Sequence, residues 1–166
     1  FGMVVFSGTG GSTVNNAGTI RNLPDIGAPD YTTDEVAFFS DNGATVLNNT
    51  GTIIGQVDAD GGQLTFNNSG SWYAGSGGND FNNVDDALNN SGTIYIRSGN
   101  TAFNGLESFL NTATGLVTMS YSNPAIGLAS PSYARSALDT LTVVNLTTEA
   151  GAQFTFDFDA AAANNA

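Results

Sequence analysis

Apolar and polar positions follow a repeated order along this chain: an apolar residue, two asparagines, a small residue, a glycine, a threonine or serine, and a second apolar residue. Four copies hold this order in full, a fifth is looser and a sixth is only a trace; they begin at Val14, Leu47, Phe66, Leu88, Leu110 and Leu146. The first five copies start 33, 19, 22 and 22 residues apart. A repeat near 20 residues indicates one turn of a solenoid, in which each turn stacks on its neighbours.

The segments around these copies have the composition of short β-strands. They are rich in β-branched and aromatic residues and are bounded by Gly, Asn and Asp, and they show no useful helical periodicity. The sequence therefore predicts an all-β parallel β-helix (β-solenoid) of about six rungs, each of about 19–22 residues. A β-sandwich is the alternative, since Asn-Gly-rich phrases also mark hairpin turns. The clearest predicted strands are Met3–Phe6, Val36–Phe39, Thr93–Ile96, Leu141–Val144 and Phe154–Phe158.

Equivalent residues of successive rungs stack about 4.8 Å apart, so the repeat also predicts the interior. Asparagines that turn inward are expected to bond up and down the stack, as Asn ladders do in cross-β structures. The asparagines are expected to tolerate left-handed turn geometry, and the glycine of each phrase to supply a positive φ at the corner. The apolar residues form two interior columns: Val14, Leu47, Phe66, Leu88 and Leu110 in one, and Ile20, Ile53, Trp72 and Ile94 in the other.

Two stretches, residues 21–35 and 119–137, interrupt the period and contain all four prolines of the chain. We expect both to leave the solenoid as loops, and long loops on a rigid scaffold often carry binding residues. We interpret the whole chain, 1–166, as a single β-solenoid segment of a longer protein. No capping segment is visible beside the first and last strands, so we expect adjoining rungs of the parent chain or copies of this chain to pair with them.

The composition excludes several classes of function. The chain has no His, Cys or Lys, and three Arg stand against 15 acidic residues, for a net charge of −12 at pH 7. Zinc sites, histidine general bases, thiol nucleophiles and Schiff-base lysines are therefore excluded. Three scattered arginines cannot form the basic surface that a nucleic acid requires. No apolar run is long enough for direct membrane insertion as a helix.

Carboxylates are the acid–base groups that remain. Asp85 and Asp86 are adjacent, so they would point to opposite faces of a strand, and we interpret them as solvated turn residues. Asp58 and Asp60, followed by two glycines, resemble a calcium loop, and residues 75–81, which include Asp80, resemble one calcium nonapeptide repeat. That repeat normally works in tandem and occurs here once. We assign no catalytic, cofactor-binding or metal-ligating residue, and calcium at Asp58/Asp60 or Asp80 is an open alternative.

Further residues of the C-terminal third follow a recognisable order: Phe103–Asn111, Gly115–Met119, Leu138–Val143 and Gly151–Asp159. Together with the repeated Asn-Asn phrases, this order resembles the passenger region of bacterial autotransporters. The resemblance covers most of the chain, but its motifs are structural, so it carries over no catalytic residue. It implies a right-handed parallel β-helix that is secreted and displayed at the bacterial outer-membrane surface. The two long inserts depart from that pattern.

These observations predict a structural or adhesive extracellular β-solenoid of a bacterial surface protein. It would act as a rigid rod or as a self-associating fibre subunit, with adjoining rungs, copies of itself, or host or surface glycans as partners. A carbohydrate-binding or carbohydrate-active β-helix is the alternative, because glycoside hydrolysis needs only a pair of carboxylates. A β-sandwich binding module is the third interpretation. Nucleic acid is not an expected partner.

Overall fold

The computed structural model of the chain describes residues 2–22, 36–75, 77–81, 85–96, 100–119 and 140–156. Within these ranges the chain forms β-strands and no helix. The strands are β1 (Met3–Phe6), β2 (Ser12–Asn16), β3 (Thr19–Arg21), β4 (Val36–Asp41), β5 (Thr45–Asn49), β6 (Thr52–Ile54), β7 (Gln56–Asp60), β8 (Leu64–Asn68), β9 (Ser71–Ala74), β10 (Gly77–Asp80), β11 (Ala87–Asn90), β12 (Thr93–Ile96), β13 (Asn100–Asn104), β14 (Ser108–Asn111), β15 (Leu116–Thr118), β16 (Thr140–Thr142), β17 (Leu146–Thr148) and β18 (Gln153–Thr155).

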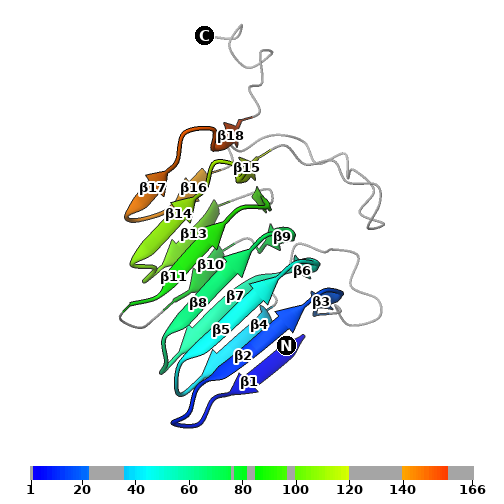
Figure 1. The fold of residues 1–166 in the computed structure, drawn as a ribbon, viewed down its shortest axis with the longest axis vertical. Coiled ribbons are helices and arrows are strands. Elements are labelled where there is room, and N and C mark those ends of the chain that lie inside the picture. The colour runs from blue at the N-terminus through cyan, green and yellow to red at the C-terminus, as the bar shows by residue number, and fades with distance from the viewer. Residues whose placement is uncertain are drawn as a thin grey trace, which may run out of the picture.

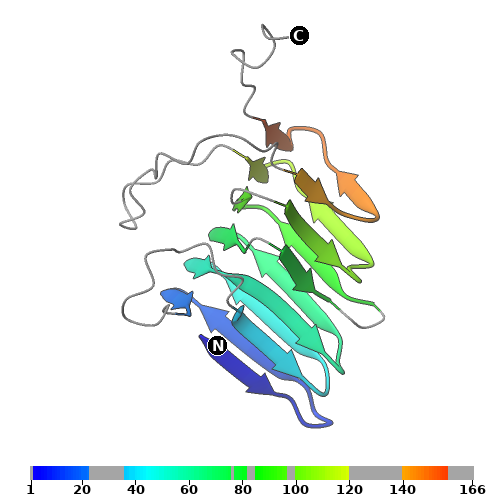
Figure 2. The same cartoon turned by 180° about the vertical axis from the view of Figure 1, so that it is seen from behind.

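The chain passes through three short strands in each of six rungs, and each strand pairs in parallel with the equivalent strand of the next rung, except that β7 and β10 are joined by a single bridge. The second strands form one sheet, β2-β5-β8-β11-β14-β17, and the third strands form another, β3-β6-β9-β12-β15-β18. The first strands form β1-β4-β7 and β10-β13-β16, which a bridge between Ala59 and Phe81 connects. Figures 1 and 2 show this stack from front and back. The predicted parallel β-solenoid is confirmed, and the antiparallel sandwich is wrong.

Most of the strands named from the sequence lie where they were expected. Met3–Phe6 and Thr93–Ile96 are β1 and β12 with the same bounds, and the strand that begins at Val36 continues to Asp41. Near the C-terminal end, β16 covers Thr140–Thr142 and β18 covers Gln153–Thr155, so both are shorter than or shifted from the prediction. Residues 157–166 lie outside the described ranges.

The first interior column has the predicted register through four rungs and differs in the fifth. Val14, Leu47, Phe66 and Leu88 pair in sequence across β2, β5, β8 and β11. The next member is Phe109, because Leu88 pairs with Phe109 and Asn89 pairs with Leu110. The prediction for Leu110 was therefore wrong by one residue, and its side chain points outward. The second column is as predicted and continues from Ile94 to Val117.

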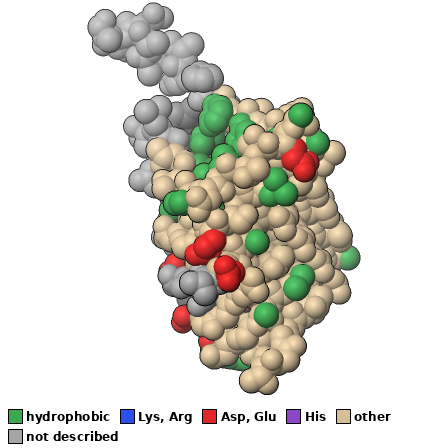
Figure 3. All heavy atoms as spheres, turned by 60° about the vertical axis from the view of Figure 1, so that its left-hand side comes forward, with side chains coloured by type: hydrophobic (Ala, Val, Ile, Leu, Met, Phe, Trp, Pro, Cys, Tyr) green, Lys and Arg blue, Asp and Glu red, His purple; other side chains and the backbone are tan. Residues whose placement is uncertain are grey.

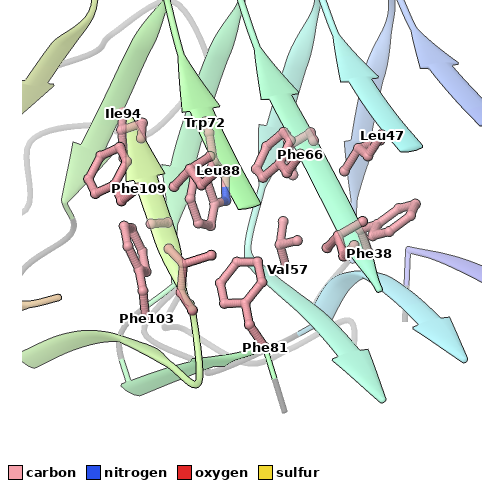
Figure 4. Packing of buried hydrophobic residues seen from close by; sticks show 14 of the residues in the cluster. Phe38, Leu47, Val57, Phe66, Trp72, Phe81, Leu88, Ile94, Phe103 and Phe109 are labelled. Atoms are coloured by element: carbon pink, nitrogen blue, oxygen red, sulfur yellow. The ribbon is translucent and has the colours of Figure 1, made fainter. Parts of the chain in front are cut away.

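The interior between the three sheets is filled by aromatic and aliphatic side chains, which Figure 4 shows pointing toward one another. Trp72 packs edge-on against Phe66, with ring centroids 5.1 Å apart, and stacks on Phe103 at 5.0 Å. Its indole N–H donates to the carbonyl oxygen of Gly55, which satisfies the one polar atom of this buried side chain. Aromatic pairs of this kind add about 0.5–1.5 kcal/mol each beyond area burial.

A ladder of asparagines runs along the solenoid beside this apolar core, as the repeat predicts. The Nδ2 of each member except the last donates to the Oδ1 of the equivalent asparagine in the next rung, over 2.7–2.8 Å. Asn49, Asn68, Asn90 and Asn111 are fully buried, and Asn16 is nearly so. A buried amide without partners costs about 1–3 kcal/mol, so a continuous ladder is the arrangement that satisfies them. The members are Asn16, Asn49, Asn68, Asn90 and Asn111.

The glycines and asparagines of the repeated phrase differ from their predicted conformation. None of Gly18, Gly51, Gly70 and Gly92 has a positive φ, and the paired asparagines are extended strand residues. Gly51, Gly70 and Gly92 are required instead by close approach between rungs, whereas a Cβ on Gly18, in the first rung, would meet only the Oδ1 of Asn16 at 4.0 Å. A Cβ on Gly70 would lie 2.2 Å from the carbonyl oxygen of Gly51, and one on Gly92 would lie 2.2 Å from that of Gly70. Stacked corners leave no room for a side chain.

Candidate functional site

Four of the acidic residues lie on the first strands of neighbouring rungs. Asp41 on β4 pairs with Asp60 on β7. Asp58 on β7 lies beside Asp80 on β10, whose backbone N–H donates to the Asp58 Oδ1 over 3.0 Å. Burial raises the pKa of Asp58 to about 6; the hydrogen bond from Asp80 lowers this pKa and the negative charge of Asp80 raises it. Asp58 therefore keeps its proton to a higher pH than an ordinary aspartate does.

This arrangement brings together two of the three residues considered for calcium and leaves the third apart. Asp58 contacts Asp80, whereas Asp60 is exposed and pairs with Asp41. Within the described ranges no group of three or more acidic side chains could hold a metal ion. Calcium takes six to eight oxygen ligands, and Gly77–Asp80 is a strand that pairs with β13. Calcium at Asp58/Asp60 or Asp80 therefore stays an alternative and is not assigned to these residues.

Asp85 and Asp86 behave differently from each other. Asp85 is exposed at a turn with a φ of 73°, as the solvated-turn interpretation requires. Asp86 is fully buried, so that interpretation was wrong for it. Its Oδ1 accepts from the backbone N–H of Leu64, and its own N–H donates to the Glu107 Oε2 over 2.8 Å. Asp86 therefore joins three successive rungs and has a structural role that its sequence neighbourhood did not reveal.

The outward face of the second sheet, which we call the Asn face, carries no charge and combines small polar side chains with the apolar side chains of Val46, Ala87 and Leu110. A second ladder runs along it: Asn48 donates to Asn15, Asn67 to Asn48, and Asn89 to Asn67, each over 2.9 Å. Figure 3 shows acidic side chains beside the lower grey atoms and near the upper right edge, with scattered apolar side chains and uncharged polar surface between them. The outward residues are Thr13, Asn15, Val46, Asn48, Thr65, Asn67, Ala87, Asn89, Ser108, Leu110 and Thr147.

Sequence reasoning identified the ladder residues but not this face. The two asparagines of each pair are adjacent in a strand, so their side chains must point to opposite sides of the sheet. That alternation alone was enough to predict one buried and one exposed ladder. Asn15 is exposed and Asn48, Asn67 and Asn89 are half-buried. These outward amides keep a second N–H and a second lone pair each, because the ladder uses only one of each. The Asn face therefore presents regularly spaced hydrogen-bonding groups that are held in place.

The third sheet carries an aromatic pair on its outward side. The rings of Tyr73 on β9 and Tyr95 on β12 stack with centroids 4.4 Å apart and an interplanar angle of 4°. Tyr73 is buried and Tyr95 is half-buried, so this pair offers little free ring surface. The two inserts that were expected to carry binding residues fall mainly on residues 23–35 and 120–137, outside the described ranges.

Comparison with protein-family models, with curated proteins and with solved structures finds no significant match to this chain. The resemblance to autotransporter passengers therefore stays a prediction. The described residues contain no helix that is long and apolar enough to cross a membrane.

Proposed function

We propose that this chain is a structural β-solenoid of a bacterial surface protein, a rigid rod that acts outside the cell. The observation that carries the proposal is the continuous buried ladder from Asn16 to Asn111, which joins five rungs. Each rung also pairs with its neighbours through two continuous parallel sheets of six strands and through the two shorter sheets of the first strands. Bending the stack would separate strands and ladder amides on one side, so the architecture favours a stiff element.

The chemistry of the chain supports a structural role over a catalytic one. His, Cys and Lys are absent from the sequence. Among the described carboxylates, Asp86 is used for backbone hydrogen bonds. Asp58 contacts Asp80 through the backbone N–H of Asp80. A glycosidase instead needs two carboxyl groups that face each other about 5–9.5 Å apart across a substrate cleft. The repeated residues are those that build and join rungs.

The rod proposal is tested by changing the number of rungs. Asn68 and Asn90 are equivalent and 22 residues apart, so a second copy of residues 69–90 inserted after Asn90 keeps the register. Three such insertions should lengthen the particle by about 14 Å, at about 4.8 Å per rung. Small-angle X-ray scattering on the monomer fraction measures this length. Three scrambled copies of the same residues are the control, and equal lengths for both insertions would contradict the proposal.

Display outside the cell needs a separate measurement. Antibodies raised against the folded chain should label intact producing cells as strongly as permeabilised ones. Labelling that requires permeabilisation would contradict the surface location and leave the rod proposal unaffected.

The Asn face favours carbohydrate binding as a second candidate function. Neutral glycans are recognised through hydrogen bonds to hydroxyl groups, and this face offers fixed amides without charge. Binding to a panel of neutral polysaccharides should be lost in a variant with both Asn48→Ala and Asn67→Ala. Asn42→Gly, at an exposed turn that is not part of the Asn face and whose φ of 54° glycine adopts without strain, is the control. Equal binding by the double variant and the control would contradict this candidate.

A further inference from the structure

The Asn face carries two ranks of side chains that run along the solenoid axis, one of amides and one of methyl groups. The amide rank is the outer ladder of Asn15, Asn48, Asn67 and Asn89. The methyl rank lies two residues earlier on three of the same strands and consists of Val46, Thr65 and Ala87. These three side chains are small and half-buried. The Asn face therefore has a polar side and an apolar side within one sheet.

Both ranks repeat with the rungs. Val46 pairs with Thr65 and Thr65 with Ala87, and the amides pair in the same register, so each rank presents one group about every 4.8 Å along the axis. The ladder bonds, each 2.9 Å long, hold the amides in place before any ligand arrives, and groups held in advance lose little entropy on binding. Figure 1 shows the strands that carry them, from β2 to β11, side by side in the stack. A ligand that meets several rungs at once must itself repeat along the axis.

Charge selects a neutral ligand. The outward residues of the Asn face include no acidic or basic side chain, whereas the chain as a whole has a net charge of −12. A polyanion would be repelled by this net charge. A polycation would be attracted to the sheet of the first strands, where Asp58 contacts Asp80 and Asp41 pairs with Asp60, in preference to the uncharged face. The ligand that fits the Asn face is therefore uncharged.

A linear polysaccharide has the repeat and the two-sided chemistry that this face requires. Each sugar ring has apolar C–H faces and hydroxyl groups at its edge, and an extended chain of β-linked sugars repeats at a spacing close to that of the rungs. A single sugar on an open sheet would make too few contacts to offset the cost of association. Several linked sugars bind as one ligand, so the contacts of successive rungs add together.

We propose that the Asn face binds an extended, neutral polysaccharide chain that lies along the solenoid axis. Hydroxyl groups at one edge of the polysaccharide pair with the second N–H and the second lone pair of each amide in the amide rank. The apolar C–H faces of its sugars lie over the methyl rank. The inference rests on the carbohydrate-binding candidate function and adds to it the type of chain, its orientation and the methyl rank as a surface that determines specificity.

Calorimetric titration of the chain with neutral oligomers of increasing length tests the repeat. The probes are cello-oligosaccharides and N-acetylated chito-oligosaccharides of two to six sugars, with polygalacturonate as the acidic comparison. Because the amide rank joins four rungs, affinity should rise at least tenfold from two to four sugars in the series that binds more tightly. Equal affinity across lengths, binding of polygalacturonate as strong as that of the neutral oligomers, or no binding of either neutral series would overturn the proposal.

Variants at Thr65 locate the site without removing a ladder amide. Thr65→Arg places a long side chain across the methyl rank and should weaken binding of the longest oligomer at least tenfold, whereas Thr65→Val keeps a methyl surface and should bind as the parent does. Thr142→Arg adds the same side chain at an exposed position of β16, in a different sheet, and is the control. Equal binding by the two arginine variants, both folded by circular dichroism, would overturn the proposal. Ala87→Arg repeats the test on the next strand if Thr65→Arg does not fold.

The outcome is separable from that of the carbohydrate candidate. If the variant with both Asn48→Ala and Asn67→Ala loses polysaccharide binding but affinity does not depend on oligomer length, carbohydrate binding stands and the extended-chain inference is overturned. If the parent chain binds no neutral polysaccharide, both are overturned. Neither result affects the rod proposal, which is tested by particle length.

Discussion

Asn49 and Asn68 occupy equivalent positions on β5 and β8, and the Nδ2 of Asn49 donates to the Oδ1 of Asn68 over 2.7 Å inside the solenoid. On the outside of the same two strands, the Nδ2 of Asn67 donates to the Oδ1 of Asn48 in the reverse direction along the stack. The inner and outer ladders therefore have opposite polarity. Each adjacent Asn pair contributes one amide to each ladder, so one short phrase joins neighbouring rungs on both faces of the sheet.

The two ladders should differ sharply in their contribution to stability. Asn68→Ala removes one of the two acceptors of the Asn49 Nδ2, which keeps the carbonyl oxygen of Ser71, and it removes the donor to the buried Oδ1 of Asn90. The change should lower the free energy of unfolding by about 2–4 kcal/mol. Asn67→Ala, one residue earlier and partly exposed, should cost about 1 kcal/mol or less because water replaces its partners. Urea unfolding of both variants measures the difference, and equal losses would contradict the inner ladder as the stronger one.

Two leucines test the register of the fifth rung. Leu88→Ala removes a fully buried side chain and should cost about 2–5 kcal/mol. Leu110→Ala changes an outward side chain of the neighbouring strand and should cost about 1 kcal/mol or less, since no interior cavity forms. Thermal unfolding of the pair checks the prediction. A loss for Leu110→Ala as large as that for Leu88→Ala would mean that Leu110, and not Phe109, lies in the interior column.

Glycines at the stacked corners should be intolerant of any side chain. Gly70→Ala puts a Cβ 2.2 Å from the carbonyl oxygen of Gly51, so the rungs must separate locally and stability should fall. We expect a loss of about 2 kcal/mol or more, comparable to an overpacked core. Gly8→Ala is the control, because no atom lies within 4 Å of the added Cβ and φ is not positive. That variant should be neutral or slightly more stable. Chemical denaturation of both variants measures the two changes in stability. A larger loss for Gly8→Ala than for Gly70→Ala would contradict the close approach at the corner.

Stability should depend on pH through Asp58. Its pKa is raised from 3.8 to about 6, mainly by burial, so the folded chain holds the proton more tightly than the unfolded chain does. The unfavourable contribution of the charged form is absent below about pH 4, grows as the pH rises, and is complete above about pH 6. Asp58→Asn keeps an oxygen to accept the Asp80 N–H and removes this charge.

The measurement is the unfolding free energy of Asp58→Asn minus that of the parent chain between pH 4 and pH 7. This difference should increase with pH across that window. A difference that is independent of pH, or that decreases, would mean that Asp58 does not titrate with a raised pKa.

The repeat was readable from the sequence because it is local and periodic. The Asn-Asn phrase recurs at a rung length, side chains alternate across a strand, and equivalent residues must stack. From these rules alone follow the parallel solenoid, the columns from Val14 to Leu88 and from Ile20 to Ile94, and the buried ladder. These features could be predicted without knowing how different segments contact each other, because each phrase pairs with another copy of the same phrase in the next rung.

The tertiary structure decided what depends on contacts between different phrases. The corner after Asn111 holds two more residues before the next strand than the corner after Asn90, and the sequence allowed either Phe109 or Leu110 to take the interior place. Stacking on Asn90 and packing against Phe103 select Phe109. Contacts between rungs also explain the buried carboxylate of Asp86, whose Oδ1 accepts from the backbone N–H of Leu64. They explain the glycine at position 70, because a Cβ there would collide with the carbonyl oxygen of Gly51. Composition and periodicity do not specify such distances, because they arise only when one rung is placed on another.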